Sequence, residues 1–231
     1  MEKALSIAET FHSLQGEGQW VGTPMFFIRL AGCNVGRSAK ALKMEPFPIL
    51  PTGREAMVCT SWDGRSFPCD TDYSLYERKT PEELISECWE KHICLTGGEP
   101  LLHYEDIENL FVHAFSKDIT IHIETSGTII PRYLGNFHKL LMSGYWIACS
   151  PKIGARDEII RRSDELKLLV DEEFRFDRLT PAMKEHKNVF LCPINEVSTV
   201  NQDNVNRCIE LIKYNPTWRV SVQLHKFLGL R

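Results

Sequence analysis

Residues 93–100 read Ile-Cys-Leu-Thr-Gly-Gly-Glu-Pro and lead into a helix-like segment, Tyr104–Ser116. A short apolar run that ends in glycines and a proline is typical of a buried strand turning into a helix. Glycines let a backbone approach a ligand closely, and an acid beside them can accept a hydrogen bond from an amine or a hydroxyl. Taken alone, this segment fits an ordinary strand-to-helix turn equally well.

On both sides of this segment, strand-like and helix-like runs alternate. Such alternation predicts a parallel α/β sheet, open or curled towards a barrel, and the absence of a repeat or linker favours one domain over residues 1–231. The predicted strands are Met25–Leu30, Ile93–Thr96, Ile119–Glu124, Tyr145–Cys149, Glu165–Val170, Asn188–Pro193 and Trp218–His225. The predicted helices are Pro81–Lys91, Tyr104–Ser116, Tyr133–Met142, Phe176–Glu185 and Gln202–Tyr214.

Several predicted strands have one apolar and one polar face. Ile119, Ile121 and Ile123 alternate with Thr120, His122 and Glu124. Arg29 stands on the polar face of Met25–Leu30, and Val220, Val222 and Leu224 alternate with polar residues near the end of the chain. Strands covered on both faces are usually continuous apolar runs, so a partial (β/α) barrel with a polar lumen fits best. Sheet edges with a solvent face are the alternative.

Charge and hydropathy exclude several classes of protein. The net charge is −4 without a long basic run, which argues against nucleic acid as a partner. No apolar stretch approaches the roughly 18 residues that a membrane span needs. The first residues lack the pattern of a secretion signal, so we expect a cytoplasmic protein with reduced thiols.

The eight cysteines contain no Cys-x-x-Cys pair. Five lie in strand-like or helix-like runs, where a small buried apolar residue is the simpler interpretation. Cys33, Cys59 and Cys69 lie instead in or beside residues 34–68, which contain four of the twelve prolines and no sustained periodicity. A long structureless loop within a compact domain is usually functional or disordered, and its bracketing by Cys33 and Cys69 favours a functional loop.

Two further polar segments follow predicted strands. Glu124-Thr125-Ser126-Gly127 and Ser150-Pro151-Lys152 each stand at the carboxyl end of a strand, as Gly97–Pro100 does. Ligand sites in parallel α/β folds gather at these ends. Three such segments in succession are stronger evidence than any one of them, although Glu124, Ser126 and Lys152 could equally form a structural polar network.

Together these segments resemble the radical S-adenosylmethionine enzymes, and more narrowly the 7-carboxy-7-deazaguanine synthase family. The Gly-Gly-Glu-Pro segment resembles the superfamily only. The narrower resemblance rests on four further segments that span nearly the whole chain: residues 11–18 (Phe-His-Ser-Leu-Gln-Gly-Glu-Gly), 27–33 (Phe-Ile-Arg-Leu-Ala-Gly-Cys), 69–73 (Cys-Asp-Thr-Asp-Tyr) and 223–227 (Gln-Leu-His-Lys-Phe).

The resemblance implies an enzyme of 7-deazapurine (queuosine-type) biosynthesis. Such an enzyme uses a [4Fe–4S] cluster and S-adenosylmethionine to contract the ring of 6-carboxy-5,6,7,8-tetrahydropterin to 7-carboxy-7-deazaguanine, with loss of ammonia. The cofactors carry the radical chemistry, and no side chain is assigned as a catalytic group. Mg²⁺, a flavodoxin- or ferredoxin-type reductant and a homodimer are implied as well.

The same resemblance implies roles for individual residues. Cys33, Cys59 and Cys69 would hold the cluster, in a loop over residues 33–71, and Thr71 would hold Mg²⁺; a turn after Asp70 is the structural alternative for Thr71. The pterin would be contacted by Leu14, Gln15, Gly16, Glu17, Arg29, Thr96 and Arg231. S-adenosylmethionine would be contacted by Pro68, Cys69, Asp70, Gly98, Glu99, Glu124, Ser126, Ser150, Pro151, Lys152, Cys192, Pro193, Ile194 and Asn195.

The cysteine spacing departs from the superfamily's short Cys-x3-Cys-x2-Cys pattern. Arg37 and Ser66 stand at the short-spacing positions, and 25 and 9 residues separate Cys33, Cys59 and Cys69. Loop closure costs grow slowly with length, so these long spacings are tolerable. Two alternatives remain from the sequence: another radical enzyme, such as a glycyl-radical activase, and a zinc-binding scaffold without enzymatic activity. An ordinary (β/α) hydrolase lacks a defensible nucleophile–base pair.

Overall fold

The computed structural model describes residues 3–38, 40–42, 48–50, 52–72, 75–131, 144–196 and 199–230. The predicted helix Tyr133–Met142 and the predicted substrate residue Arg231 lie outside the described residues. Among the described residues, none of the helices has the length and apolar character needed to cross a membrane.

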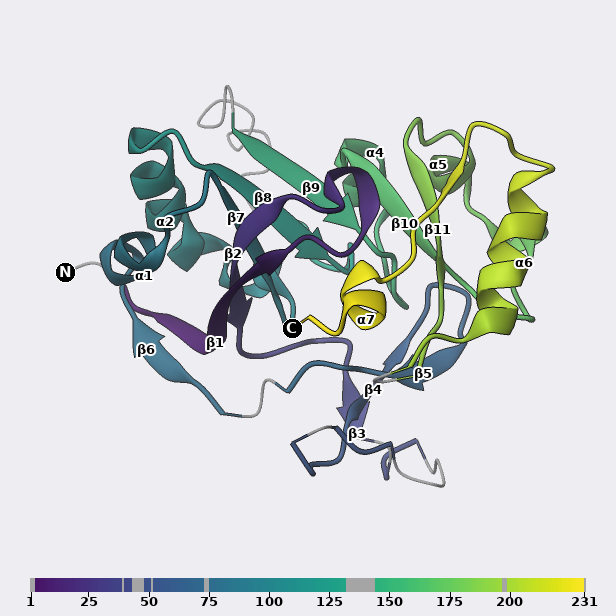
Figure 1. Ribbon diagram of the computed structural model, residues 1–231, viewed down its shortest axis with the longest axis horizontal. Coiled ribbons are helices and arrows are strands. Elements are labelled where there is room, and N and C mark those ends of the chain that lie inside the picture. The colour runs from purple at the N-terminus through teal and green to yellow at the C-terminus, as the bar shows by residue number, and fades with distance from the viewer. Residues whose placement is uncertain are drawn as a thin grey trace.

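A nine-stranded sheet forms the centre of the molecule, in the order β12-β11-β10-β9-β8-β7-β2-β1-β6 (Figure 1). Seven neighbouring strands run parallel to one another, namely β2, β7, β8, β9, β10, β11 and β12. Strand β1 pairs antiparallel with both β2 and β6. The order has two ends, so the described sheet is open, and the predicted fold class is confirmed. The bounds are β1 Leu5–Leu14, β2 Pro24–Leu30, β6 Glu77–Lys79, β7 His92–Gly97, β8 Thr120–Thr125, β9 Tyr145–Cys149, β10 Glu165–Val170, β11 Val189–Pro193 and β12 Arg219–Val220.

The helices connect the parallel strands, and several begin at a side-chain cap. Thr80 and Glu83 form a reciprocal capping box at the start of α1, and Thr180 and Asn201 cap α5 and α6. The helices are α1 Pro81–Glu87, α2 Tyr104–Ser116, α4 Asp157–Arg162, α5 Pro181–Lys184, α6 Gln202–Ile212 and α7 Leu224–Leu228. Three 3₁₀ turns complete them: η1 Gly18–Trp20, η2 Pro100–His103 and η3 Phe176–Arg178.

Two apolar clusters bury the helices against the sheet. The first joins β1, β2, β7 and β8 to α1 and α2, with Ile28, Leu95, Ile107 and Leu110 fully buried. The second joins β10 and β11 to α4, α5 and α6, around Leu168. Both clusters include a residue of β9, so this strand connects the two halves of the core.

The predicted structureless loop contains regular structure, and that part of the prediction is wrong. Strands β3 Arg37–Ser38, β4 Met57–Thr60 and β5 Ser66–Pro68 form an antiparallel sheet, at the lower edge of Figure 1. The turn between β4 and β5 is closed by Ser61, whose hydroxyl and backbone bond to Arg65. Three short strands that pair over only two or three residues give too few alternations for a periodic pattern in the sequence.

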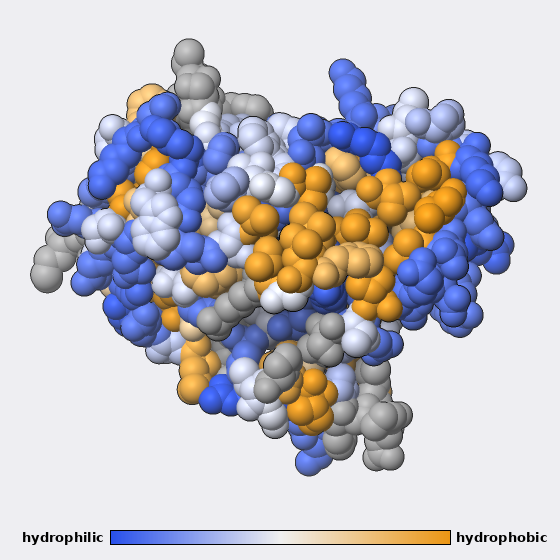
Figure 2. Space-filling model, in the orientation of Figure 1, coloured by the Kyte–Doolittle hydropathy of each residue, from blue (hydrophilic) through white to orange (hydrophobic). Residues whose placement is uncertain are grey.

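The predicted strand Trp218–His225 is also wrong beyond Val220. The chain pairs with β11 through Val220 and then turns, because the Leu224 amide donates to the carbonyl of Gly16 and the next residues form α7. Gly229 ends this helix in the left-handed conformation. Figure 2 shows apolar surface over this part of the molecule, where Phe227 and Leu228 are exposed.

Candidate active site

Two adjoining cavities open at the carboxyl ends of the parallel strands. The larger, about 250 Å³, contains Cys33, Cys59 and Cys69 and is here called the thiol cavity. The smaller, about 190 Å³, contains Arg29 and is here called the arginine cavity. Seven residues line both cavities: Glu17, Asp70, Thr71, Thr96, Glu124, Lys167 and Gln223. These seven residues are here called the shared wall. Molecules bound in the two cavities would therefore lie next to each other, against the same residues.

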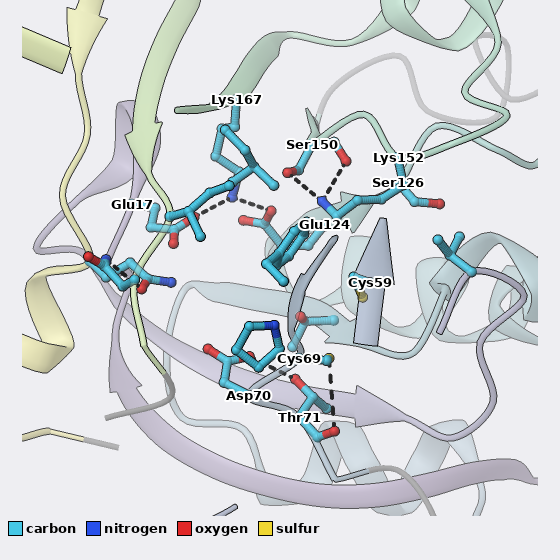
Figure 3. Close-up of a pocket in the computed structure, with 18 of the residues that line it drawn as sticks. Glu17, Cys59, Cys69, Asp70, Thr71, Glu124, Ser126, Ser150, Lys152 and Lys167 are labelled. Carbon is cyan, nitrogen blue, oxygen red and sulfur yellow. Dashed lines mark hydrogen bonds and ion pairs between the residues drawn. The ribbon is translucent and has the colours of Figure 1, made fainter. Parts of the chain in front are cut away.

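The three cysteines reach the thiol cavity from three different segments. Cys33 follows β2, and its sulfur accepts the backbone N–H groups of Val35 and Gly36. Cys59 lies within β4, and Cys69 follows β5 with its amide bonded to the carbonyl of Met57. The small sheet therefore brings Cys59 and Cys69 together across the long spacing in the sequence (Figure 3).

The chemistry of these thiols fits an iron–sulfur cluster. A hydrogen bond with Cys69 lowers the pKa of the Cys59 thiol, against the opposing effect of burial, and the Lys152 ammonium lowers it further. Among the described residues, no three His, Cys, Asp or Glu side chains are close enough to hold one metal ion. Cysteine thiolates are the usual ligands of iron–sulfur clusters, and three of them leave one iron of a four-iron cluster open to another ligand.

The Gly97-Gly98 turn brings the end of β7 against the end of β2. The amides of Gly98 and Glu99 donate to the carbonyls of Leu30 and Gly32, each at 2.9 Å. A Cβ atom at Gly98 would collide with the carbonyl of Gly32, so this turn has no room for a side chain. The close approach of the two strand ends therefore requires glycines here, and both glycines also line the thiol cavity.

Lys152 and Ser150 form a polar pair at the end of β9. The Lys152 ammonium donates to the Ser150 hydroxyl at 2.8 Å and to its carbonyl at 2.9 Å (Figure 3). Both residues line the thiol cavity, together with the end of β11 at Pro193, Ile194 and Asn195. This pair presents a cation and a hydroxyl to whatever occupies the cavity.

Glu99, Pro151 and Cys192 line neither cavity among the described residues. Glu99 is buried, and its carboxylate accepts the Thr125 hydroxyl at 2.7 Å, the Ser126 amide at 2.8 Å and the Ser126 hydroxyl. These donors occupy the carboxylate, so Glu99 fixes the segment after β8 rather than facing a ligand. Cys192 is buried inside β11.

Arg29 lines the arginine cavity, and several contacts hold its guanidinium in place. Its Nε atom pairs with the Glu9 carboxylate at 2.7 Å, and its Nη1 atom donates to the Thr71 hydroxyl at 2.9 Å. The guanidinium lies over the Phe11 ring, 5.3 Å from its centroid. An arginine fixed in this way can receive a carboxylate through its remaining N–H groups.

The N-terminal motif and α7 complete this cavity. Leu14, Gln15 and Gly16 line it from one side, and Gln223 and His225 line it from the other. Gly16 is in close contact with His225, because a Cβ atom at Gly16 would lie 2.5 Å from the ring nitrogen Nδ1. The two ends of the chain therefore form this part of the wall together.

Lys167 was not predicted from the sequence. Its buried ammonium pairs with Glu17 at 3.0 Å and with Glu124 (Figure 3). The sequence does contain a sign of a functional residue here. Glu165 and Lys167 are charged, and they alternate with apolar residues in an otherwise apolar strand. From the sequence, Glu165–Val170 is predicted as a strand without a site residue.

The remaining predicted site residues all lie at the cavities. Leu14, Gln15, Gly16 and Arg29 line the arginine cavity, and Glu17, Asp70, Thr71, Thr96 and Glu124 line the shared wall. Cys33, Cys59, Pro68, Cys69, Gly98, Ser126, Ser150, Lys152, Pro193, Ile194 and Asn195 line the thiol cavity. The shared wall thus contains members of both predicted sets, and the other members lie in the cavity of their own set.

The chain is similar to known proteins over nearly its whole length. The chain is 30% identical to the 7-carboxy-7-deazaguanine synthase of Bordetella pertussis, over 98% of this chain and 99% of the other. It is 32% identical to the protein of the same name from Buchnera aphidicola, over 97% and 98% of the two chains. The crystal structure of QueE from Escherichia coli superposes with a TM-score of 0.66 at 25% identity, covering 96% and 95% of the chains. No model of a protein family matches the chain.

Proposed function

Because the chain belongs to the 7-carboxy-7-deazaguanine synthase family, we propose that it forms 7-carboxy-7-deazaguanine from 6-carboxy-5,6,7,8-tetrahydropterin. The reaction is that of a radical S-adenosylmethionine lyase, in which the pterin ring contracts and one molecule of ammonia is lost. The observation that carries this proposal is the shared wall between a cavity with three thiols and a cavity with a fixed arginine. One cavity suits the cofactors and the other suits a small carboxylate.

The thiol cavity would hold the cofactors. Cys33, Cys59 and Cys69 would ligate a [4Fe–4S] cluster, and S-adenosylmethionine would lie against Lys152, Ser150 and the end of β11. When bound, the cluster and S-adenosylmethionine together supply the radical that starts the reaction. The protein contributes binding and orientation: the Lys152 ammonium and the Ser150 hydroxyl suit a carboxylate, and the Gly97-Gly98 backbone lets the cofactor approach the sheet.

The arginine cavity would hold the pterin. Arg29 would bind the substrate carboxylate, since its guanidinium is already held by Glu9 and Thr71. Thr71 lies on the shared wall and would place its hydroxyl on Mg²⁺, a cation that prefers oxygen ligands and keeps several waters.

A flavodoxin- or ferredoxin-type reductant, a homodimer and a cytoplasmic location remain predictions. Exposed Phe227 and Leu228 on α7 would suit a subunit interface.

The proposal is tested with anaerobically reconstituted protein. Mass spectrometry should detect 7-carboxy-7-deazaguanine only when the pterin, S-adenosylmethionine, a reductant and Mg²⁺ are all present. Formation of 5′-deoxyadenosine with unchanged pterin would support the radical cofactors and contradict the substrate. Protein that binds no iron would contradict both.

The cysteine assignment has its own comparison. Cys59→Ala should lose the cluster absorbance, most of the bound iron and the activity, because one of three ligands is removed. Cys88→Ala is the matched control, since Cys88 is half-buried and lies outside both cavities. Equal iron contents in the two variants would contradict Cys59 as a ligand.

A further inference from the structure

The cation at the centre of the shared wall is Lys167, in the middle of β10. Its side chain is 5% exposed, and those of Glu17 and Glu124 are 20% and 18% exposed. The ammonium donates to Glu17 Oε2 at 3.0 Å and to Glu124 Oε2. Figure 3 shows the ammonium between the two carboxylates, which come from the segment after β1 and from the end of β8. One positive charge is thus set against two negative charges.

Gln15 makes this arrangement more rigid. Its Nε2 atom donates to Glu124 Oε1 at 3.3 Å, and its Oε1 atom accepts the Glu17 amide at 3.2 Å. Lys167 bonds to each carboxylate through one oxygen atom. Glu17 and Glu124 each line both cavities. Carboxylates held in this way have acceptor capacity left for a ligand.

The proposed substrate needs such acceptors. Arg29 binds one end of a 6-carboxypterin, and the other end is an aminopyrimidinone ring whose edge presents adjacent N–H donors. A carboxylate can accept two parallel N–H bonds, and such bonds are stronger when the carboxylate is ionised. The acceptors must stay ionised in a buried site, where an unpaired carboxylate tends to take up a proton.

We propose that Lys167 is a positioning residue that holds Glu17 and Glu124 as an ionised acceptor pair for the N–H-rich edge of the pterin. This inference rests on the proposed function and assigns Glu124, predicted above as a cofactor contact, to the substrate as well. Lys167 itself does not react. It acts by fixing where the two carboxylates point and by keeping Glu17 charged.

The electrostatic surroundings support this role. Burial alone would raise the pKa of Glu17, but the Lys167 charge and hydrogen bond lower it to about 2. Burial would lower the pKa of Lys167, yet Glu124, Glu17 and Glu165 hold it well above its usual value. The ionisable groups around Lys167 are Glu17 after β1, Arg29 on β2, Cys94 on β7, Glu124 on β8, Cys149 on β9, Glu165 on β10, Cys192 on β11, and His225 and Lys226 on α7.

The test measures pterin binding rather than turnover. Reconstituted protein is titrated anaerobically with 6-carboxytetrahydropterin by calorimetry without reductant, so that no reaction occurs. Lys167→Met should raise the Kd about 10- to 100-fold at pH 7, which is the loss expected for a charge-assisted hydrogen bond. The affinity for S-adenosylmethionine, measured in parallel, should change less than about threefold.

The pH dependence separates positioning from a structural effect. Without the Lys167 charge, burial would raise the pKa of Glu17, so this carboxyl would recover its charge only as the pH rises. The Kd of Lys167→Met is divided by that of the wild type, because ionisation of the ligand affects both values equally. This ratio should therefore fall as the pH rises from 6 to 9. A constant ratio, or an unchanged Kd, would overturn the proposal.

Three further proteins complete the design. Lys167→Arg keeps the charge and should show a smaller loss without the pH-dependent ratio. Glu165→Gln, on the same face of β10 but outside both cavities, should keep the wild-type Kd within about threefold. Lys167→Gln, also neutral, replaces Lys167→Met if the latter does not fold. Wild-type protein that fails to bind the pterin would contradict the proposed function itself, whereas wild-type binding with unaffected Lys167 variants contradicts only this inference.

Discussion

Glu165, a neighbour of Lys167 outside both cavities, makes the stability of the fold depend on pH. This carboxyl is buried at the start of β10, where it accepts the Gln19 amide at 2.8 Å. Burial raises its pKa from 4.5 to about 7, although the nearby Lys167 charge acts in the other direction. Between these two values the folded protein binds the proton more tightly than the unfolded chain does. The free energy of unfolding therefore falls as the pH rises from 4.5 to 7.

Glu165→Gln should remove this dependence. Above pH 7 the wild type carries the full cost, about 3 kcal/mol for a shift of this size, whereas at pH 5 its carboxyl is protonated and resembles an amide. The variant should therefore melt about 5–10 °C above the wild type at pH 8 and close to it at pH 5. Circular dichroism melts at pH 5, 6.5 and 8 measure the difference, and a difference independent of pH would contradict the burial argument.

Residues were predictable where the motif itself carries the chemistry. Cys33, Cys59 and Cys69 were selected because packing did not explain them, and the structure places all three in one cavity. Lys167 was missed because its meaning depends on partners distant in the chain: Glu17 is 150 residues away and Glu124 is 43 residues away. A single sequence gives the alternation of charge in a strand but not the carboxylates that the sheet brings to it.

At the scale of elements, α7 depends on a contact with the other end of the chain. The Leu224 amide donates to the Gly16 carbonyl at 2.9 Å, and the His225 ring lies where a side chain at Gly16 would project. A helix of five residues has little stability of its own. The segment Leu224–Leu228 should therefore be helical only while it packs against the N-terminal motif.

Gly16→Ala should loosen α7. The added methyl group would stand 2.5 Å from His225 Nδ1, so the ring and the helix must move. Hydrogen exchange of the amides in residues 224–228 should accelerate at least about tenfold, which corresponds to about 1.4 kcal/mol of local stability, while α2 exchanges as before. In a His225→Ala background, where the space is free, the same substitution should have little further effect. Unchanged exchange in Gly16→Ala would contradict the coupling.

Elements with long regular patterns were predicted best. Tyr104–Ser116, Tyr145–Cys149 and Glu165–Val170 have the bounds expected from the sequence. Helix α4 and strand β1 were missed, and Phe176–Glu185 is divided into η3 and α5, because Thr180 and Pro181 start a new helix. The strand predicted beyond Val220 failed because tertiary contacts of Gly16 and Ser221 outweigh a short alternation.

At the scale of the whole molecule, the site needs both halves of the core. The thiol cavity is lined by the ends of β7 and β8, which belong to the first apolar cluster, and by those of β10 and β11, which belong to the second. Among the described strands, only β9 contributes to both clusters, through Ile147 and Cys149. Its backbone pairs with β8 on one side and with β10 on the other, so the ladder of hydrogen bonds continues across the boundary.

This continuity predicts that the chain unfolds as one unit, in agreement with the single domain expected from its sequence. Leu110→Ala removes a fully buried side chain from the first cluster, and Leu168→Ala removes one from the second. Each should cost about 2–5 kcal/mol, and each should shift the whole of a single calorimetric transition. Val112→Ala, on the exposed face of α2, is the control and should shift it little. If Leu168→Ala instead split the transition, with the first half melting at the wild-type temperature, the two clusters would be separate units. The site would then be an interface between domains, because both cavities are lined by residues of both halves.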